Sequence, residues 1–319
     1  MLSRFNMLLL FLPLTVLGQK KLTEEQIFQD YVVLKNVLTK GHPSLYVYTS
    51  KSKWDSLFLN FEENKIKTID NKNDLYKSII ELTDYVRDGH LIVMRPQIDS
   101  LPNFFPLLLK IINKKLYADT DDFGIPVGSE ILSIDGVKAK ELRDRFMKYA
   151  SADGFNETKK DRQIEMEFGI LHFYEFGAKL TYKVEYRNPS DEVITTTIES
   201  ETFERIGKRF IKRNSFLARK TLSEKWPHLY FIDSANTAVL TLNSFHLDVD
   251  RFQVVLENIF KNIKQKKTKN LIIDIRQNEG GYPVNAIKSF SYIAKKPFKQ
   301  QASSYVITDI LPEEQYSKN

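Results

Sequence analysis

The sequence predicts a multi-module protein of mixed α+β and α/β class, with an N-terminal helical bundle, a strand-rich middle module and a partial α/β core. Three observations predict it. Amphipathic helical runs open the chain, alternating segments bounded by turn residues follow, and the last third holds a short apolar strand that leads into a glycine loop and a helix. The 319 residues are 42% hydrophobic and 28% charged, which suits buried cores and excludes fibrous or disordered classes. We expect a signal peptide at 1–19, a helical segment at 20–97, a strand-rich module at 98–200 and the core at 201–319.

The N-terminus has the pattern of a cleaved secretory signal. Arg4 precedes the apolar run Met7–Leu17, and the small residue Gly18 follows it. The run is too short for a membrane span, which needs about 20 apolar residues. The chain has no cysteine, so it can form no disulfide and offers no thiol for lipid attachment. We expect a periplasmic or extracellular protein without an integral membrane span after signal cleavage.

Beyond the signal, three amphipathic runs predict a small helical bundle. Thr23 and Gln26 form a capping-box pattern at the start of the first helix. Apolar residues recur at helical spacing within Ile27–Leu38, Trp54–Phe61 and Leu75–Val86. We interpret the aromatic residues of these runs as core.

The middle module is expected to be rich in strands. Leu107–Ile112 and Lys115–Asp119 predict a hairpin, and Val127–Val137 predicts a strand that ends in the Asp135-Gly136 turn. The remaining expected elements are two helices and two alternating strands, at Lys138–Lys148, Asn156–Phe176, Lys179–Tyr186 and Val193–Ile198.

The last third predicts an α/β unit. A buried type of strand at Ala238–Leu242 is followed by a helix at Val249–Ile263, a strand at Asn270–Ile275 and a helix at Pro283–Ala294. The loop between the second strand and the last helix lies where α/β folds usually place their chemistry.

That loop carries the first of two motifs with chemical potential. Asp274, Arg276 and Asn278 place charged and amide side chains at the strand end, and Gly280 and Gly281 let backbone N–H groups approach a ligand. Such a loop can hold an oxyanion or a phosphate. A nucleotide site is disfavoured because no Gly-Lys-Ser/Thr follows. A tight turn without chemistry is the alternative explanation of a lone glycine pair.

The second motif is Asp88-Gly89-His90, expected between the third helix and a strand beginning at Leu91, with Gly89 as a left-handed helix cap. A histidine there can act as a general base because imidazole titrates near neutral pH. The alternative is a hydrogen-bonded structural histidine. The other histidines show no metal-ligand spacing, and we expect neither a metal nor a cofactor: they are His42, His172, His228 and His246.

The net charge of +6 does not predict a nucleic-acid partner. The lysines are spread along the chain, and no basic stripe with interleaved aromatic residues stands out. The densest group, within Lys261–Lys269, follows a helical pattern, where cations offset the helix dipole. We interpret it as a solvated face.

In content and order, the helical segment, Asp88–His90, Val127–Gly136 and Asp274–Gly281 resemble the tail-specific (C-terminal processing) serine protease family, in its tricorn-core-like branch. The resemblance extends from Thr23 to the end of the chain. It implies a PDZ-like strand-rich module, a partial crotonase-like protease core, no cofactor, and a polypeptide substrate or peptide ligand.

The same resemblance implies residue roles. His90 would be the general base, and the N–H of Gly280 or Gly281 would supply part of the oxyanion hole. A serine hydroxyl would attack the peptide carbonyl. The loop would be shaped by its three polar residues, Asp274, Arg276 and Asn278. Ser129 departs from the family, which often has an aspartate at that position.

The nucleophile is not identified, because no strand-to-helix turn of the family's type surrounds the late serines, which are Ser289, Ser291, Ser303, Ser304 and Ser317. Three interpretations follow. The first is a serine peptidase whose sequence here is incomplete and inactive alone, with apolar surface exposed around Ile273, Ile287 and Tyr292. The second is a non-catalytic pseudo-protease of the cell envelope that binds peptides or apolar ligands. The third is an active hydrolase that uses an unrecognised serine.

Overall fold

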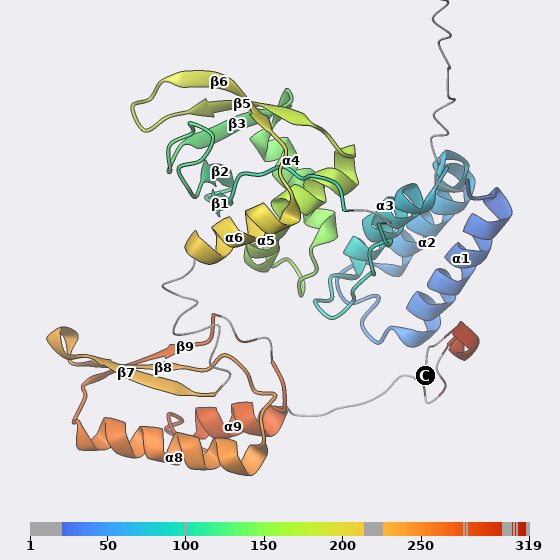
Figure 1. Cartoon of the computed structure of the whole chain (residues 1–319). Helices are drawn as coiled ribbons and strands as arrows, with labels where there is room; N and C mark the ends of the chain where they lie inside the picture. The colour runs from blue at the N-terminus through green and yellow to red at the C-terminus, as the bar shows by residue number, and fades with distance from the viewer. Residues whose placement is uncertain are drawn as a thin grey trace, which may run out of the picture. The chain divides into compact units, whose positions relative to one another are not determined.

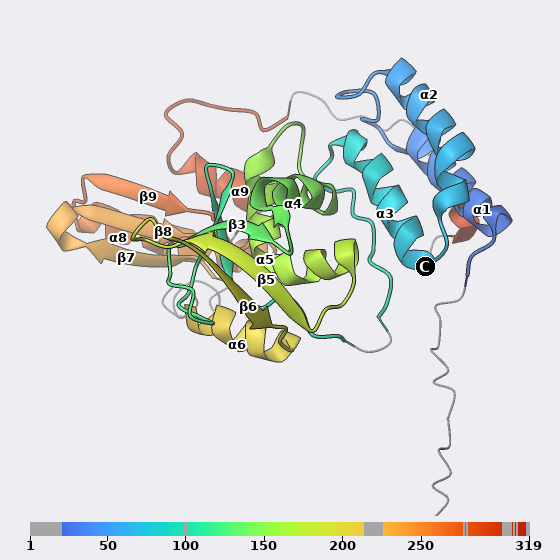
Figure 2. The same ribbon diagram turned by 90° about the horizontal axis from the view of Figure 1, so that it is seen from above.

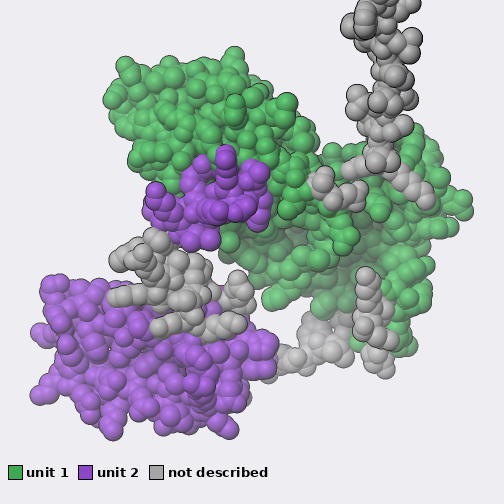
Figure 3. All heavy atoms as spheres, in the orientation of Figure 1, with its two compact units in different colours: residues 1–201, 306–319 green, residues 202–305 purple. Residues whose placement is uncertain are grey.

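The computed structural model describes residues 21–98, 101–213, 226–276, 278, 280–301, 308, 310 and 312–316. The chain forms two compact units (Figure 3): unit 1 comprises Met1–Glu201 with Val306–Asn319, and unit 2 comprises Thr202–Tyr305. The predicted signal peptide, and Ser303, Ser304 and Ser317, lie outside the described residues. None of the described helices combines the length and the apolar character that a bilayer crossing needs. Each unit is described by itself.

Unit 1 begins with helices that lie side by side (Figures 1 and 2). Thr23 and Gln26 form the predicted capping box, with both reciprocal hydrogen bonds present. Tyr31 stacks on Phe61 with ring centroids 4.6 Å apart, and Trp54 is fully buried beside them. The aromatic residues therefore form a core, as predicted. The helical elements are α1 (Glu24–Asn36), η1 (Val37–Gly41), α2 (Lys51–Asn60), η2 (Phe61–Lys65), η3 (Ile66–Thr68), α3 (Lys72–Thr83) and η4 (Asp84–Val86).

The strand-rich part of unit 1 is an antiparallel sheet with the order β1-β2-β3-β5-β6, and β4 pairs with β3. The predicted Asp135-Gly136 turn joins β3 to β4, with positive φ angles of 50° and 80°. The strands are β1 (Leu109–Ile112), β2 (Lys115–Ala118), β3 (Glu130–Ile134), β4 (Val137–Lys138), β5 (Thr181–Arg187) and β6 (Val193–Glu199). The helices are α4 (Ala139–Phe146), η5 (Met147–Tyr149) and α5 (Glu157–Phe176).

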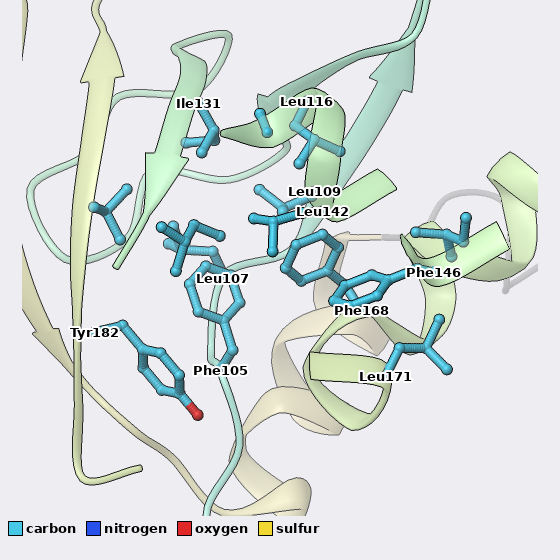
Figure 4. Close-up of a cluster of buried hydrophobic side chains, with 14 of the residues drawn as sticks. Phe105, Leu107, Leu109, Leu116, Ile131, Leu142, Phe146, Phe168, Leu171 and Tyr182 are labelled. Atoms are coloured by element: carbon cyan, nitrogen blue, oxygen red, sulfur yellow. The ribbon is translucent and has the colours of Figure 1, made fainter. Parts of the chain in front are cut away.

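A large apolar cluster joins this sheet to its helices (Figure 4). Phe146 of α4 and Phe168 of α5 meet edge to face with ring centroids 5.2 Å apart. His172 of α5 is buried against Phe105 and Tyr182. Burial lowers the pKa of His172 to about 4, so this histidine is a neutral residue of the core at neutral pH.

Unit 2 contains a three-stranded sheet with the order β7-β8-β9, in which β7 and β8 are antiparallel and β8 and β9 are parallel. Figure 1 shows α8 and α9 along one face of this sheet. Strand β8 is buried at all five positions, as its apolar sequence predicts. The elements of unit 2 are α6 (Phe203–Arg213), β7 (His228–Ile232), η7 (Asp233–Ala235), β8 (Thr237–Thr241), α8 (Val249–Gln265), β9 (Asn270–Asp274) and α9 (Pro283–Ser291). The short η8 (Glu314–Tyr316) belongs to unit 1.

The other face of the unit 2 sheet exposes apolar side chains. Tyr230, Ile232 and Ile272 are 36%, 38% and 51% exposed. Among the residues that the sequence expected at an apolar surface, Ile287 is 39% exposed, whereas Ile273 and Tyr292 are half-buried.

Two local predictions in unit 1 are wrong. Leu91–Ile98 forms no strand, because no neighbouring strand pairs with it among the described residues. Gly89 is not the left-handed residue after α3 and η4. Arg87 takes that conformation, with a φ of 57°, one residue after η4 ends.

Candidate functional site

The Asp88–His90 turn is fixed by its own aspartate. After Arg87 reverses the chain, the Asp88 carboxylate accepts the backbone N–H of His90 over 2.7 Å. The same oxygen lies 3.3 Å from the His90 Nδ1 atom. The His90 side chain is 94% exposed. A carboxylate that faces Nδ1 favours the proton on that nitrogen, which leaves Nε2 free to accept one.

A second histidine faces the other side of the Asp88 carboxylate. The His42 Nε2 atom lies 3.5 Å from Asp88 Oδ2, and His42 is largely buried. Burial acts to raise the pKa of Asp88, but the hydrogen bonds from His90 and the nearby charges of His42 and His90 outweigh it and hold the pKa below its usual range. Asp88 is therefore ionised at neutral pH and can orient the His90 ring. No sequence pattern links His42 to Asp88, because the two residues lie far apart along the chain and are brought together by the fold.

Residues just before α5 and in its first turn form hydrogen bonds with Gly89. Its N–H donates to the Asp153 carboxylate over 2.7 Å, and its carbonyl accepts the Ser151 hydroxyl over 3.1 Å and the Lys159 ammonium over 3.4 Å. A Cβ at Gly89 would lie 3.1 Å from both the Asp153 carboxylate and the Lys159 ammonium. Glycine at this position therefore allows the close approach of these two side chains, and Gly89 does not have a positive φ.

Asp88, His90 and Asp153 bring three ligand-type atoms within 4.8 Å of one another. Sequence spacing could not show this group, because Asp153 is distant along the chain. We assign no metal to it, since a carboxylate oxygen of each aspartate already accepts a backbone N–H and no other feature of the group points to a cation.

The glycine loop of unit 2 begins with an ion pair between two of its predicted shaping residues. The Asp274 carboxylate, at the end of β9, receives Arg276 Nε over 2.9 Å and Arg276 Nη2 over 2.7 Å. It also accepts the Arg276 backbone N–H. These hydrogen bonds hold the pKa of Asp274 below its ordinary value against a smaller opposing effect of burial. The pair fixes the direction in which the chain leaves the strand.

Asn278 forms a hydrogen bond between the middle of the loop and the residue that follows β8. Its amide donates to the carbonyl of Leu242 over 2.8 Å, and its side-chain oxygen accepts the N–H of Gly280 over 2.8 Å. The Gly280 N–H is therefore already engaged within the loop.

Gly281 lies against the segment after β8. Phe245 donates its N–H to the Gly280 carbonyl, and Tyr282 donates its N–H to the Phe245 carbonyl. This pairing turns the Gly281 N–H away from Phe245, and that N–H donates no hydrogen bond within the described part of the chain. Gly281 has a φ of 133°, and a Cβ there would collide with the backbone of Phe245 and His246. Only glycine fits.

A buried amide holds the facing segment in place. Asn285 of α9 is 1% exposed and donates to the carbonyls of Phe245 over 3.0 Å and Leu247 over 2.9 Å. No sequence motif marks this residue, because its two partners lie about 40 positions away along the chain.

The predicted site residues thus fall into two groups. Asp274, Arg276, Asn278, Gly280 and Gly281 come together in one loop of unit 2. His90 belongs to unit 1, where it contacts Asp88, and His42 faces the other oxygen of the same carboxylate.

The two late serines that the structure describes, Ser289 and Ser291, both lie in α9, and their hydroxyls donate hydrogen bonds within that helix. Ser289 donates its hydroxyl to the Asn285 carbonyl over 2.9 Å, and Ser291 donates to the Lys288 carbonyl over 2.6 Å. Neither hydroxyl is placed as a nucleophile.

Part of the chain matches a known protein family, and the chain shares its fold with solved structures. Residues 236–310 match peptidase family S41, a segment that contains β8, α8, β9, the glycine loop and α9. No curated protein matches the chain.

Three solved structures of CPAF share the fold. A serine-to-alanine mutant of CPAF is 14% identical, with a TM-score of 0.52 over 81% of this chain and 57% of that one. Mature CPAF is 13% identical, with a TM-score of 0.51 over 81% and 56% of the two chains. Mature CPAF complexed with lactacystin is 13% identical, with a TM-score of 0.53 over 84% and 59%.

The present chain therefore spans a little over half of the length of these structures. The match of residues 236–310 to peptidase family S41 and the mixed helix-and-sheet fold shared with CPAF confirm the resemblance to the tail-specific protease family that was drawn from the sequence.

Proposed function

We propose that the protein is a tail-specific-protease-like serine peptidase that cleaves exported polypeptides, with His90 as its general base. The observation that carries the proposal is the peptidase family match at 236–310, because the matched segment contains the whole glycine loop. The exposed His90 ring, held by an ionised Asp88, supplies a second element of the same chemistry.

In the proposed reaction, His90 Nε2 takes the proton of a serine hydroxyl while the serine oxygen bonds to the peptide carbonyl carbon. The carbonyl electrons move to its oxygen. The Gly281 N–H, which is turned away from Phe245, donates to that oxyanion, whereas the Gly280 N–H is held by Asn278. The proton then passes from His90 to the leaving amine, and water hydrolyses the acyl-enzyme.

The proposal extends to the organisation of the chain. We assign 1–19 to a signal peptide, 20–97 to a helical segment, 98–200 to a PDZ-like module and 201–319 to part of a crotonase-like core. The antiparallel sheet with α4 and α5 supports the PDZ-like assignment, and the β8-α8-β9 unit supports the core. The signal-like N-terminus supports export to the periplasm or beyond the cell.

The test of catalysis is hydrolysis of an unfolded polypeptide by the protein expressed from its complete gene and by its His90→Ala variant. The proposal expects wild-type cleavage and a loss of at least a hundredfold in the variant, since general-base catalysis contributes about 10²–10⁴ in rate. Equal rates in both proteins would contradict a role for His90.

A second function is a pseudo-protease that binds peptides without cutting them. It is favoured by one observation: the described late serines donate their hydroxyls to backbone carbonyls. Peptide binding without turnover by the wild-type protein would support it over the peptidase.

A further inference from the structure

Unit 1 contains a pocket of about 490 Å³ beside the turn that carries His90. Its walls come from the end of α3 and η4, the extended segment after His90, the residues around η5, and α5. The volume lies within the range of small-ligand sites. Because Asp88 and Gly89 are among the residues that line the pocket, an occupant would lie next to the proposed base, His90.

The acidic side chains of the pocket are already paired. Asp84 pairs with Lys160, and Glu167 receives both terminal nitrogens of Arg95. Asp88 lies between the rings of His42 and His90.

One of the pocket's basic residues is equally committed. Lys148 forms ion pairs with Glu81 over 3.2 Å and with Glu175 over 3.0 Å. Together with Arg95, it is neutralised by carboxylates of the protein itself.

Arg87 and Lys159 differ from these residues. Within the described part of the chain, no ion pair joins either of them to a carboxylate. Among the described residues, Lys159 Nζ donates one hydrogen bond, to the Gly89 carbonyl at 3.4 Å. The Arg87 guanidinium lies 4.1 Å from the centroid of the Phe155 ring, and its Nε is buried and donates to no acceptor among the described residues. A buried donor of this kind favours an acceptor brought by a ligand.

Another part of the pocket lining is apolar and accessible. Ile92 and Met94 are 71% and 83% exposed and belong to an extended segment that pairs with no strand among the described residues. A ligand that joins an aliphatic stem to an anionic end would match both the basic part and the apolar part of the lining. A glutamate or aspartate side chain on an extended peptide has this combination.

We propose that the pocket binds an acidic side chain of a peptide substrate, with Arg87 and Lys159 as the partners of its carboxylate. The inference rests on the proposed function, because it takes the ligand to be a peptide held beside His90. It gives the site a preference for acidic residues near the bond to be cleaved.

The experiment measures binding of two extended peptides by calorimetry. The peptides have blocked ends and differ only in a central glutamate or glutamine. Wild-type protein is expected to bind the glutamate peptide about tenfold more tightly, as expected for a charge-assisted contact. Arg87→Gln and Lys159→Gln should each reduce this ratio below about threefold. Both substitutions keep the backbone contacts, including the Arg87 carbonyl that accepts the Gly154 N–H.

The matched control is Arg187→Gln, which removes one positive charge from β5, where Arg187 pairs with Asp191 outside the pocket. It should keep the wild-type ratio. Equal affinity of the two peptides for the wild type would overturn the proposal. So would tight binding of a glutamine peptide with a free C-terminal carboxylate together with weak binding of the blocked glutamate peptide.

Hydrolysis is measured separately on the same samples. A glutamate preference without cleavage would leave the pocket standing and contradict the proposed peptidase activity. Cleavage of both peptides at equal kcat/KM, together with equal affinity for the two, would support the proposed peptidase activity and contradict the proposed acidic preference of the pocket.

Discussion

The two motif regions are held by different means. Side chains position His90: Asp88 contacts it directly, and Asp153, Ser151 and Lys159 fix the neighbouring Gly89. In the glycine loop the backbone itself is confined, since Gly281 lies against Phe245 and His246. The comparison teaches that His90 can change without damage to the fold, whereas Gly281 cannot. Substitutions in the two regions should therefore differ in their effect on stability.

The largest effect is expected for Gly281→Ala. The new methyl group would collide with the backbone of Phe245 and His246, and the φ of 133° is strained for any residue except glycine. We expect a loss of stability on the order of 3 kcal/mol or more in unit 2. Hydrogen exchange of the β9–α9 segment measures it. Gly280→Ala is the matched control, because its Cβ would meet no atom within 4 Å and only the strain of a φ of 101° remains.

Asn285→Ala is expected to cost about 2 kcal/mol, because it leaves the carbonyls of Phe245 and Leu247 without their amide donor. Thermal unfolding measures the change. Asn262→Ala, at an exposed position of α8, is the control and should shift the transition very little. A similar loss in both variants would show that the amide of Asn285 does not hold the facing segment.

Asp88→Asn tests the electrostatic part of the His90 turn. The folded-state pKa of Asp88 lies below the ordinary value of 3.8, so its ionised form stabilises the fold above that pH, and the contribution is lost as the pH falls through the lower folded value. The wild type should therefore lose about 1 kcal/mol more than the variant between about pH 5 and pH 2. Urea unfolding across this range measures it, and parallel pH profiles would contradict the assignment.

The smallest effect on stability is expected for His90→Ala. The ring is 94% exposed and has Asp88 as its neighbour, so the free energy of unfolding should change by less than about 0.5 kcal/mol. Urea unfolding of wild type and variant measures this change. A loss comparable to that of Gly281→Ala would remove the contrast between the two regions.

Local patterns predicted local structure well. The sequence correctly predicted the Thr23 capping box, the Asp135-Gly136 turn and the β8-α8-β9 unit. A helix cap, a tight turn and an apolar periodicity each depend on residues that are neighbours in the sequence. The strand predicted from Leu91 failed because a strand needs a partner that sequence alone does not supply. Helix α6 and strand β7 are additional to the predicted elements.

The sites were predictable only as motifs. The sequence identified His90 and Gly281 as members of two patterns, but His42 and Asn285 act on them across long stretches of chain. The conformation of Arg87 was also missed, since the pattern favoured Gly89 as the left-handed residue. Tertiary packing brings such distant residues together, and these contacts cannot be deduced directly from one sequence.

His90 is proposed as the base of a serine peptidase, and the decisive measurement is labelling of the protein, expressed from its complete gene, with a serine-reactive fluorophosphonate, followed by peptide mapping of the adduct. If His90 is that base, one serine is labelled in the wild type, and His90→Ala, shown to be folded by circular dichroism, loses the label. A folded wild type that takes no label, or a label that persists in His90→Ala, would contradict it.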